Sequence, residues 1–160
     1  MKKVFPLNIK IGQILGIISI LNDNGGSISL QELSDESFLQ ADDLVNIIDA
    51  CKILGLLSVK GEKIKLKRKL AKRNQHEITA LISEKIVKIE PFSRIIKDIK
   101  FNGKISTTEL FHDLVNKGLI NYRDNILGIE EFKKNLLVIG IRLKILSYNH
   151  EEDIWKVHKE

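Results

Sequence analysis

The sequence predicts a mainly α-helical fold with small β wings (α+β), organised as tandem winged-helix-like domains joined by a helix. Three observations predict it: an internal repeat, helical apolar patterns on both sides of the repeated motif, and a hairpin pattern that closes each copy. The repeat comprises residues 26–33 (Gly-Ser-Ile-Ser-Leu-Gln-Glu-Leu) and 103–110 (Gly-Lys-Ile-Ser-Thr-Thr-Glu-Leu), which agree at five of eight positions with an offset of 77.

The first copy gives the order of the elements. After a short extended piece, Ser29 can cap a short helix. A longer helix is predicted over 41–54 by apolar residues at helical spacing, and Gly55 can end it. Two strand patterns, 56–59 and 63–66, follow on either side of a glycine-containing turn. We therefore expect the order helix, short strand, helix, helix, two-stranded wing.

The second copy repeats this order with an insertion. Ser106 and Glu109 have the spacing of a capping box, and apolar residues recur at helical spacing over 129–143. A hairpin pattern follows over 145–157, where the offset to the first copy has grown to 89. An insertion of twelve residues near 116–128 accounts for the difference.

Between the copies, residues 75–90 carry apolar side chains at helical spacing, and Pro91 suits the first turn of the next helix. We expect a connecting helix here. The predicted domains are therefore a first winged-helix-like domain over 1–73, the connecting helix over 74–90, and a second winged-helix-like domain over 91–160.

Composition excludes several classes of protein. With 43% apolar residues the chain can pack a core, and its longest apolar stretch, 11–21, is too short to span a membrane. A single cysteine, Cys51, excludes an internal disulfide framework, so we expect a cytoplasmic protein without membrane insertion. Twenty-one lysines against four glutamines are typical of a protein from a thermophile.

The net charge of +5 comes from one segment. Residues 60–73 carry eight basic residues and one acidic residue, so this segment is +7 and the other 146 residues sum to −2. Such a patch favours contact with nucleic acid or with an acidic partner, and a solvated hairpin explains it about as well. The candidate contact residues are Lys60, Lys63, Lys65, Lys67, Arg68 and Lys69.

A family resemblance rests on several short motifs that agree together. They are Ile-Gly-Gln-Ile-Leu-Gly at 11–16, the glycine pair at 25–26, Asp-Leu at 43–44, Asp-Ala-Cys-Lys-Ile-Leu-Gly at 49–55 and Gly-Glu-Lys-Ile-Lys-Leu at 61–66. With these motifs the chain, from Pro6 to about Val157, resembles the AAA-associated C-terminal domain family. That domain usually follows the ATP-binding subunit of nitrate, sulfonate or taurine type ABC transporters. The resemblance implies a regulatory appendage with no catalytic residues.

The chain departs from the family in two ways. The second wing of family members is usually preceded by a W-G-R-Y-A-E run, whereas residues 139–144 read Ile-Gly-Ile-Arg-Leu-Lys, so that only Gly140 remains. The sequence also starts at Met1, directly before the domain, without an ATPase ahead of it. We therefore expect the chain to act alone or on a separately encoded ABC ATPase subunit.

No motif for catalysis or metal binding is present. The chain lacks the G-x-x-x-x-G-K-[ST] phosphate loop, its four histidines are isolated, and Cys51 lies on an apolar stripe. We therefore expect neither enzymatic activity nor a cofactor nor a metal.

Two functions remain, and the predicted helices distinguish them. The outer face of the helix over 41–54 is rich in aspartate, which phosphates repel, and residues 136–141 are apolar all round. A non-catalytic regulatory or protein-interaction module is the first hypothesis. A winged-helix DNA-binding transcriptional regulator that contacts phosphates through the basic wing is the alternative. The candidate interface residues, for a protein partner or a homodimer, are Leu137, Val138 and Ile141.

Overall fold

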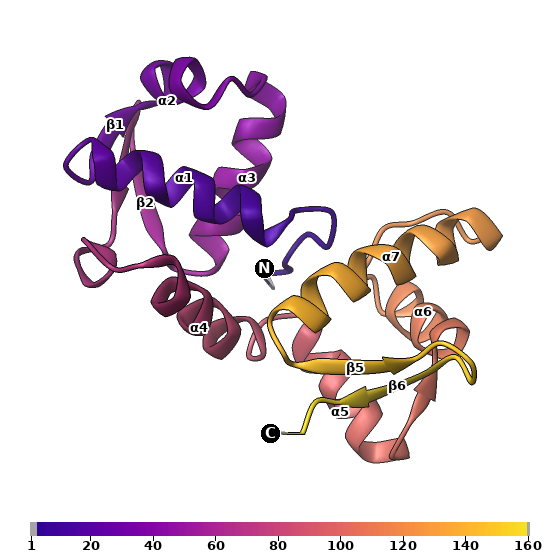
Figure 1. Cartoon of the computed structure of the whole chain (residues 1–160). Coiled ribbons are helices and arrows are strands. Elements are labelled where there is room, and N and C mark those ends of the chain that lie inside the picture. The colour runs from indigo at the N-terminus through magenta and orange to yellow at the C-terminus, as the bar shows by residue number, and fades with distance from the viewer. Residues whose placement is uncertain (1–2, 160) are drawn as a thin grey trace. The chain divides into compact units, whose positions relative to one another are not determined.

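The computed structural model describes residues 3–159, which form two compact units (Figure 1). The N-terminal unit comprises residues 9–81, and the C-terminal unit comprises residues 82–159 together with residues 3–8. The domain boundaries at 73 and 91 remain a prediction. Within the described residues, no helix combines the length and the apolar character needed to cross a membrane.

The N-terminal unit has the predicted order of elements. Its three strands form an antiparallel sheet in the order β1-β3-β2, so the short strand adds to the edge of the hairpin. The elements are α1 (Ile11–Asp23), β1 (Ser27–Ser29), α2 (Leu30–Ser37), α3 (Ala41–Ile53), β2 (Leu57–Lys60), β3 (Lys63–Leu66), the 3₁₀ turn η1 (Arg68–Leu70) and α4 (Gln75–Ile86), whose last turn belongs to the C-terminal unit.

Helix α1 organises the core of this unit. It packs against α2, α3 and the sheet, and Ile14, Ile18 and Leu21 on one of its faces are buried. Cys51 is buried on α3, as predicted, and burial raises the pKa of its thiol to about 12. The thiol therefore stays protonated at neutral pH and acts as a small apolar side chain.

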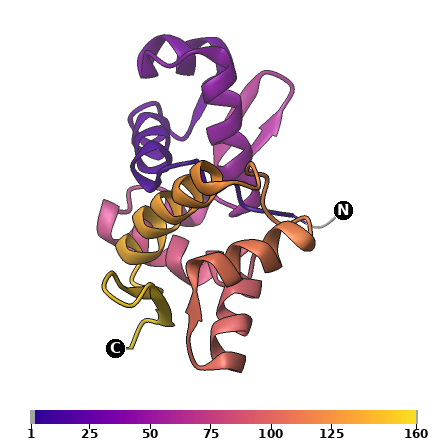
Figure 2. The ribbon, with the colours of Figure 1, turned by 90° about the vertical axis from the view of Figure 1, so that its right-hand side faces the viewer.

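The C-terminal unit repeats this topology. Its strands form an antiparallel sheet in the order β4-β6-β5, the counterpart of β1-β3-β2. Figure 2 shows its helices from the side, with α7 in gold. The elements are α5 (Phe92–Asn102), β4 (Ile105–Ser106), α6 (Thr107–Asn116), α7 (Ile126–Arg142), β5 (Leu146–Asn149) and β6 (Ile154–Val157).

Both predicted helix caps are present. The Oγ atoms of Ser29 and Ser106 accept hydrogen bonds from the backbone N–H groups of Glu32 and Glu109, at 3.1 and 3.3 Å. These bonds satisfy backbone donors that a helix start leaves free. The repeated motif is therefore a strand that turns into a capped helix.

The connecting helix is shorter than predicted. It ends at Ile86 instead of Glu90, and the next residues form turns. Glu90 instead bridges to Val4, and its carbonyl oxygen accepts a hydrogen bond from the N–H of Phe5 at 2.6 Å. Pro91 adds to this at Glu90, because the residue that directly precedes a proline is disfavoured in helical conformation.

The insertion of the second copy forms a fixed loop between α6 and α7. The Tyr122 ring packs against the rings of Phe111 and Phe132, and its hydroxyl accepts a hydrogen bond from Asn135 Nδ2 at 2.8 Å. Asn125 caps α7, since its Oδ1 accepts from the N–H of Gly128 at 2.8 Å. The loop is thus held by contacts with the helices on both sides.

Candidate interaction sites

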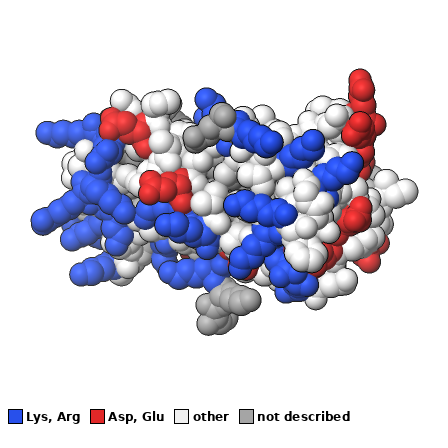
Figure 3. Space-filling view, turned by 90° about the horizontal axis from the view of Figure 1, so that it is seen from below, with Lys and Arg blue, Asp and Glu red and all other residues white. Residues whose placement is uncertain are grey.

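The candidate basic residues lie along the β2–β3 hairpin of the N-terminal unit and on the 3₁₀ turn that follows it. Lys60 ends β2, Lys63 and Lys65 lie on β3, and Lys67 follows β3 in extended conformation. All four are exposed, and so are Arg68 and Lys69 on η1. Lys and Arg side chains gather on this unit at the left of Figure 3.

The strand register places three of these lysines on one face of the sheet. Lys60 lies directly opposite Lys63, and Lys65 lies between Ser27 and Ser58 of the neighbouring strands. Directly paired residues of an antiparallel sheet point to the same side. The buried Ile64, between the two β3 lysines, occupies the opposite face, which faces the core. The solvent face therefore presents lysine and serine side chains.

The candidate apolar interface lies on the second half of α7. Val138 and Ile141 are 42% and 45% exposed, which is unusual for large aliphatic side chains, and Leu137 is half-buried. Two further aliphatic side chains, Ile126 and Leu127, are 79% and 75% exposed at the start of the same helix. Helix α7 thus has exposed apolar side chains near both ends.

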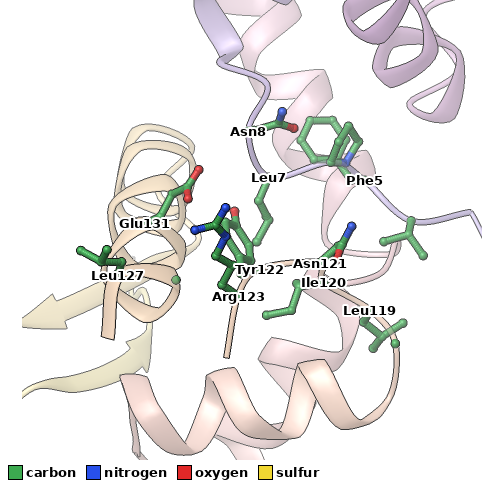
Figure 4. A pocket seen from close by; sticks show the side chains of 14 residues that line it. Phe5, Leu7, Asn8, Leu119, Ile120, Asn121, Tyr122, Arg123, Leu127 and Glu131 are labelled. Carbon is green, nitrogen blue, oxygen red and sulfur yellow. The ribbon is translucent and has the colours of Figure 1, made fainter. Parts of the chain in front are cut away.

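An open pocket lies beside the start of α7, within the C-terminal unit (Figure 4). Its volume is about 810 Å³, and the insertion loop, the N-terminal segment and α7 enclose it. Leu7 and Ile120 supply apolar surface, while Arg123 and Glu131 lie on the same side of it. Because Leu127 lines it too, the pocket adjoins the exposed apolar start of the helix.

Helices α5 and α6 share a cluster of charged groups that the sequence analysis did not identify. Arg94 Nε lies 3.0 Å from Asp98 Oδ1 and 3.4 Å from Asp113 Oδ2, and Lys117 Nζ lies 3.0 Å from Asp113 Oδ1. The other oxygen of Asp98, Oδ2, is buried and accepts no hydrogen bond from an N–H or O–H group of the described residues, so that only a proton shared with another carboxyl group can pair it. The two carboxyl groups therefore compete for one guanidinium group.

The two carboxyl groups titrate differently. Burial raises the pKa of Asp98 to about 6, and a hydrogen bond with Asp113 adds to the increase. The same hydrogen bond lowers the pKa of Asp113, with Lys117 and Arg94 contributing. A proton on Asp98 that is shared with Asp113 explains both directions.

Replacing Asp98 with asparagine is expected to stabilise the protein by about 1–2 kcal/mol at pH 7. Because the folded-state pKa of Asp98 exceeds the ordinary value, wild-type stability should fall as pH rises from about 4 to about 6. The asparagine variant should lack this fall, which urea unfolding at several pH values measures. Asp113→Asn, which removes a partner of Arg94 and Lys117, should give no gain at pH 7. If stability changed with pH equally in Asp98→Asn and in the wild type, this result would contradict the shared proton.

No group of three or more potential metal ligands occurs within residues 3–159.

Comparison with known families gives a match to the model of the C-terminal AAA-associated domain over residues 31–132, well over half of the chain. The chain belongs to this family. The match lies within the stretch from Pro6 to Val157 over which the sequence resembles the family, and it includes the wing and the start of α7. Neither curated proteins nor solved structures give a match.

The structure explains why this AAA-associated domain has a glycine at position 140, the one residue of the W-G-R-Y-A-E run that remains in its sequence. A Cβ atom at position 140 would lie 2.9 Å from Leu146 Cδ1 and 3.1 Å from Leu146 Cβ. Gly140 therefore lets β5 approach α7 closely.

Proposed function

We propose that the chain is a non-catalytic accessory module that binds the ATP-binding subunit of an ABC-type transporter and regulates it. Membership of the AAA-associated family is the observation that carries this proposal. Binding of a partner protein requires a contact surface on this chain, and the exposed aliphatic side chains of α7 supply one.

The proposed contact is the second half of α7. Val138 and Ile141 follow one another at a spacing of three residues and therefore share a helix face, with Leu137 beside them. Covering the parts of Val138 and Ile141 that remain exposed would contribute about 1 kcal/mol each. A homodimer is the other occupant that this surface would suit.

A sequence-selective DNA regulator is the weaker alternative. It needs a helix that reads base edges in the major groove. In the N-terminal unit, the helix that would have to read the bases is α3. It exposes Asp42, Asp43 and Asp49, and phosphates repel such a face. We therefore do not propose base readout by this chain.

The test is direct binding to ABC-type ATP-binding subunits encoded in the same genome, purified one at a time. Isothermal titration should detect one of them, and adding the chain should change the ATPase rate of that subunit. The proposed function is wrong if no subunit binds and no ATPase rate changes.

The double substitution Val138→Glu and Ile141→Glu should weaken this binding at least about tenfold, because it places two charges in a contact that excludes water. The melting temperature should stay within about 2 °C, since both side chains are already exposed. The matched control is Ile126→Glu with Leu127→Glu at the other end of the helix. Equal loss in both variants would refute the assignment to the second half of α7. Sedimentation of the wild type and of each variant would reveal a homodimer on the same surface.

A further inference from the structure

The solvent face of the N-terminal sheet carries positive charge that the protein itself does not neutralise. In the described residues, the ion pairs involve Arg73, Arg94, Lys117 and His112, and none involves a lysine of β2 or β3. Between residues 57 and 73 the sequence has a single acidic residue, Glu62, in the turn of the hairpin.

The arrangement of these lysines opposes folding. Lys60 lies directly across from Lys63, and like charges in this position repel each other. A carboxylate at either position would remove the repulsion and create a favourable pair. The sheet therefore carries like charges at positions where a pair of opposite charges would make it more stable. A surface that binds an anionic partner has such an arrangement.

The spacing of the charges fits a regular polyanion. Lys63, Lys65 and Lys67 occupy alternate positions of one extended segment, with Ile64 buried and Leu66 half-buried between them. Their backbone span is about 13 Å, along which one strand of a duplex presents about four phosphates. Three cations in a row on one face can therefore contact several phosphates along one strand.

We infer that this face, formed by β3, Lys60 and η1, binds the phosphate backbone of double-stranded nucleic acid without sequence selection. The inference goes beyond the proposed function and does not depend on it. Residues 57–73 contain no aromatic side chain, so there is no ring to stack on an unpaired base or to insert at a membrane interface. Binding to the phosphate backbone of a duplex requires neither stacking nor insertion.

The absence of base readout follows from the neighbouring helix. Because α3 exposes three aspartates, it cannot enter a groove beside the wing without repulsion. Contacts to phosphate alone fix no sequence. Random and genomic duplexes should therefore bind equally.

The experiment measures binding of a fluorescent duplex to the full chain by anisotropy at several salt concentrations. Three phosphate contacts give a log–log salt slope of about −2.7, so affinity should fall about 40-fold between 50 and 200 mM salt. A scrambled duplex should compete as well as the original. No binding at 50 mM salt, or tight binding that resists salt and selects sequence, would overturn the inference.

The triple variant Lys63→Glu, Lys65→Glu, Lys67→Glu should lose at least about tenfold in affinity. Its matched control is Lys97→Glu, Lys100→Glu, Lys104→Glu, which changes the net charge equally at exposed lysines of the C-terminal unit. Equal loss in both variants would show a general charge effect and refute the assigned face. Flotation with vesicles that contain phosphatidylglycerol is the further arm. Vesicle binding that needs the same three lysines, without duplex binding, would also refute the inference.

A single substitution separates binding from folding. Lys63→Glu places a carboxylate opposite Lys60 and should leave the melting temperature unchanged or raise it, because repulsion becomes attraction. The same substitution should weaken duplex binding several-fold. Unchanged binding by a folded Lys63→Glu variant would contradict the inference.

Discussion

Replacing Gly128 with alanine is expected to destabilise the C-terminal unit by about 3 kcal/mol, at the upper end of overpacking costs. A Cβ atom at this position would lie 1.8 Å from the backbone oxygen of Arg123 and 2.8 Å from the carbonyl carbon. Backbone cannot yield as a side chain can, so the insertion loop must move away from α7. That movement would break the cap in which Asn125 Oδ1 accepts from the N–H of Gly128.

Urea unfolding followed by the fluorescence of Trp155, the single tryptophan, measures this loss, because the ring is fully buried in the same unit. Gly140→Ala is the control within the unit and should cost less, since the atoms it meets belong to the Leu146 side chain. Gly16→Ala on α1 meets nothing within 4 Å and should stabilise the protein by about 0.5–1 kcal/mol. A Gly128→Ala variant as stable as the wild type would show that the loop is not fixed against the helix.

The internal repeat made the fold predictable. Helix caps such as Ser29 and Ser106 were predictable from the neighbouring sequence, because a cap needs only the next turn of helix. The exposure of the wing lysines was predictable for the same reason, since strand alternation alone places them opposite Ile64. The end of α4 was not predicted, because its apolar pattern continues past Ile86 while the pairing of Glu90 with Val4 joins residues far apart in sequence.

The features that the sequence analysis missed depend on tertiary contacts. Asp98 and Asp113 lie on different helices, fifteen positions apart. The signals in the sequence were the spacings of four residues between Arg94 and Asp98 and between Asp113 and Lys117. The pocket beside α7 had a clearer signal, because the insertion that lines it was visible as the change in repeat offset. An insertion in one copy of a repeat indicates where that copy differs, and here it forms one wall of the pocket.

Replacing Thr107 with valine is expected to destabilise the C-terminal unit by about 3 kcal/mol. Thr107 is 2% exposed, and its Oγ1 accepts a hydrogen bond from Trp155 Nε1 at 2.8 Å while donating to Asp153 Oδ1, which Tyr148 also contacts. Valine keeps the shape but leaves the buried indole N–H without an acceptor. An unsatisfied buried donor costs about 1–3 kcal/mol, and the lost bond to a carboxylate adds to it.

The pH dependence of stability distinguishes this network from simple packing. Burial would raise the pKa of Asp153, but hydrogen bonds from Thr107 and Tyr148 outweigh it, so that the pKa lies below its ordinary value. The stabilisation is therefore complete above about pH 4 and is lost as the pH falls through the lowered pKa. Thr107→Val should show a smaller loss on acidification. Thr107→Ser keeps the hydroxyl and should cost only about 1 kcal/mol, for the missing methyl group, with the wild-type pH profile. If the serine and valine variants lose equal stability, the methyl group and not the hydrogen-bond network stabilises this site.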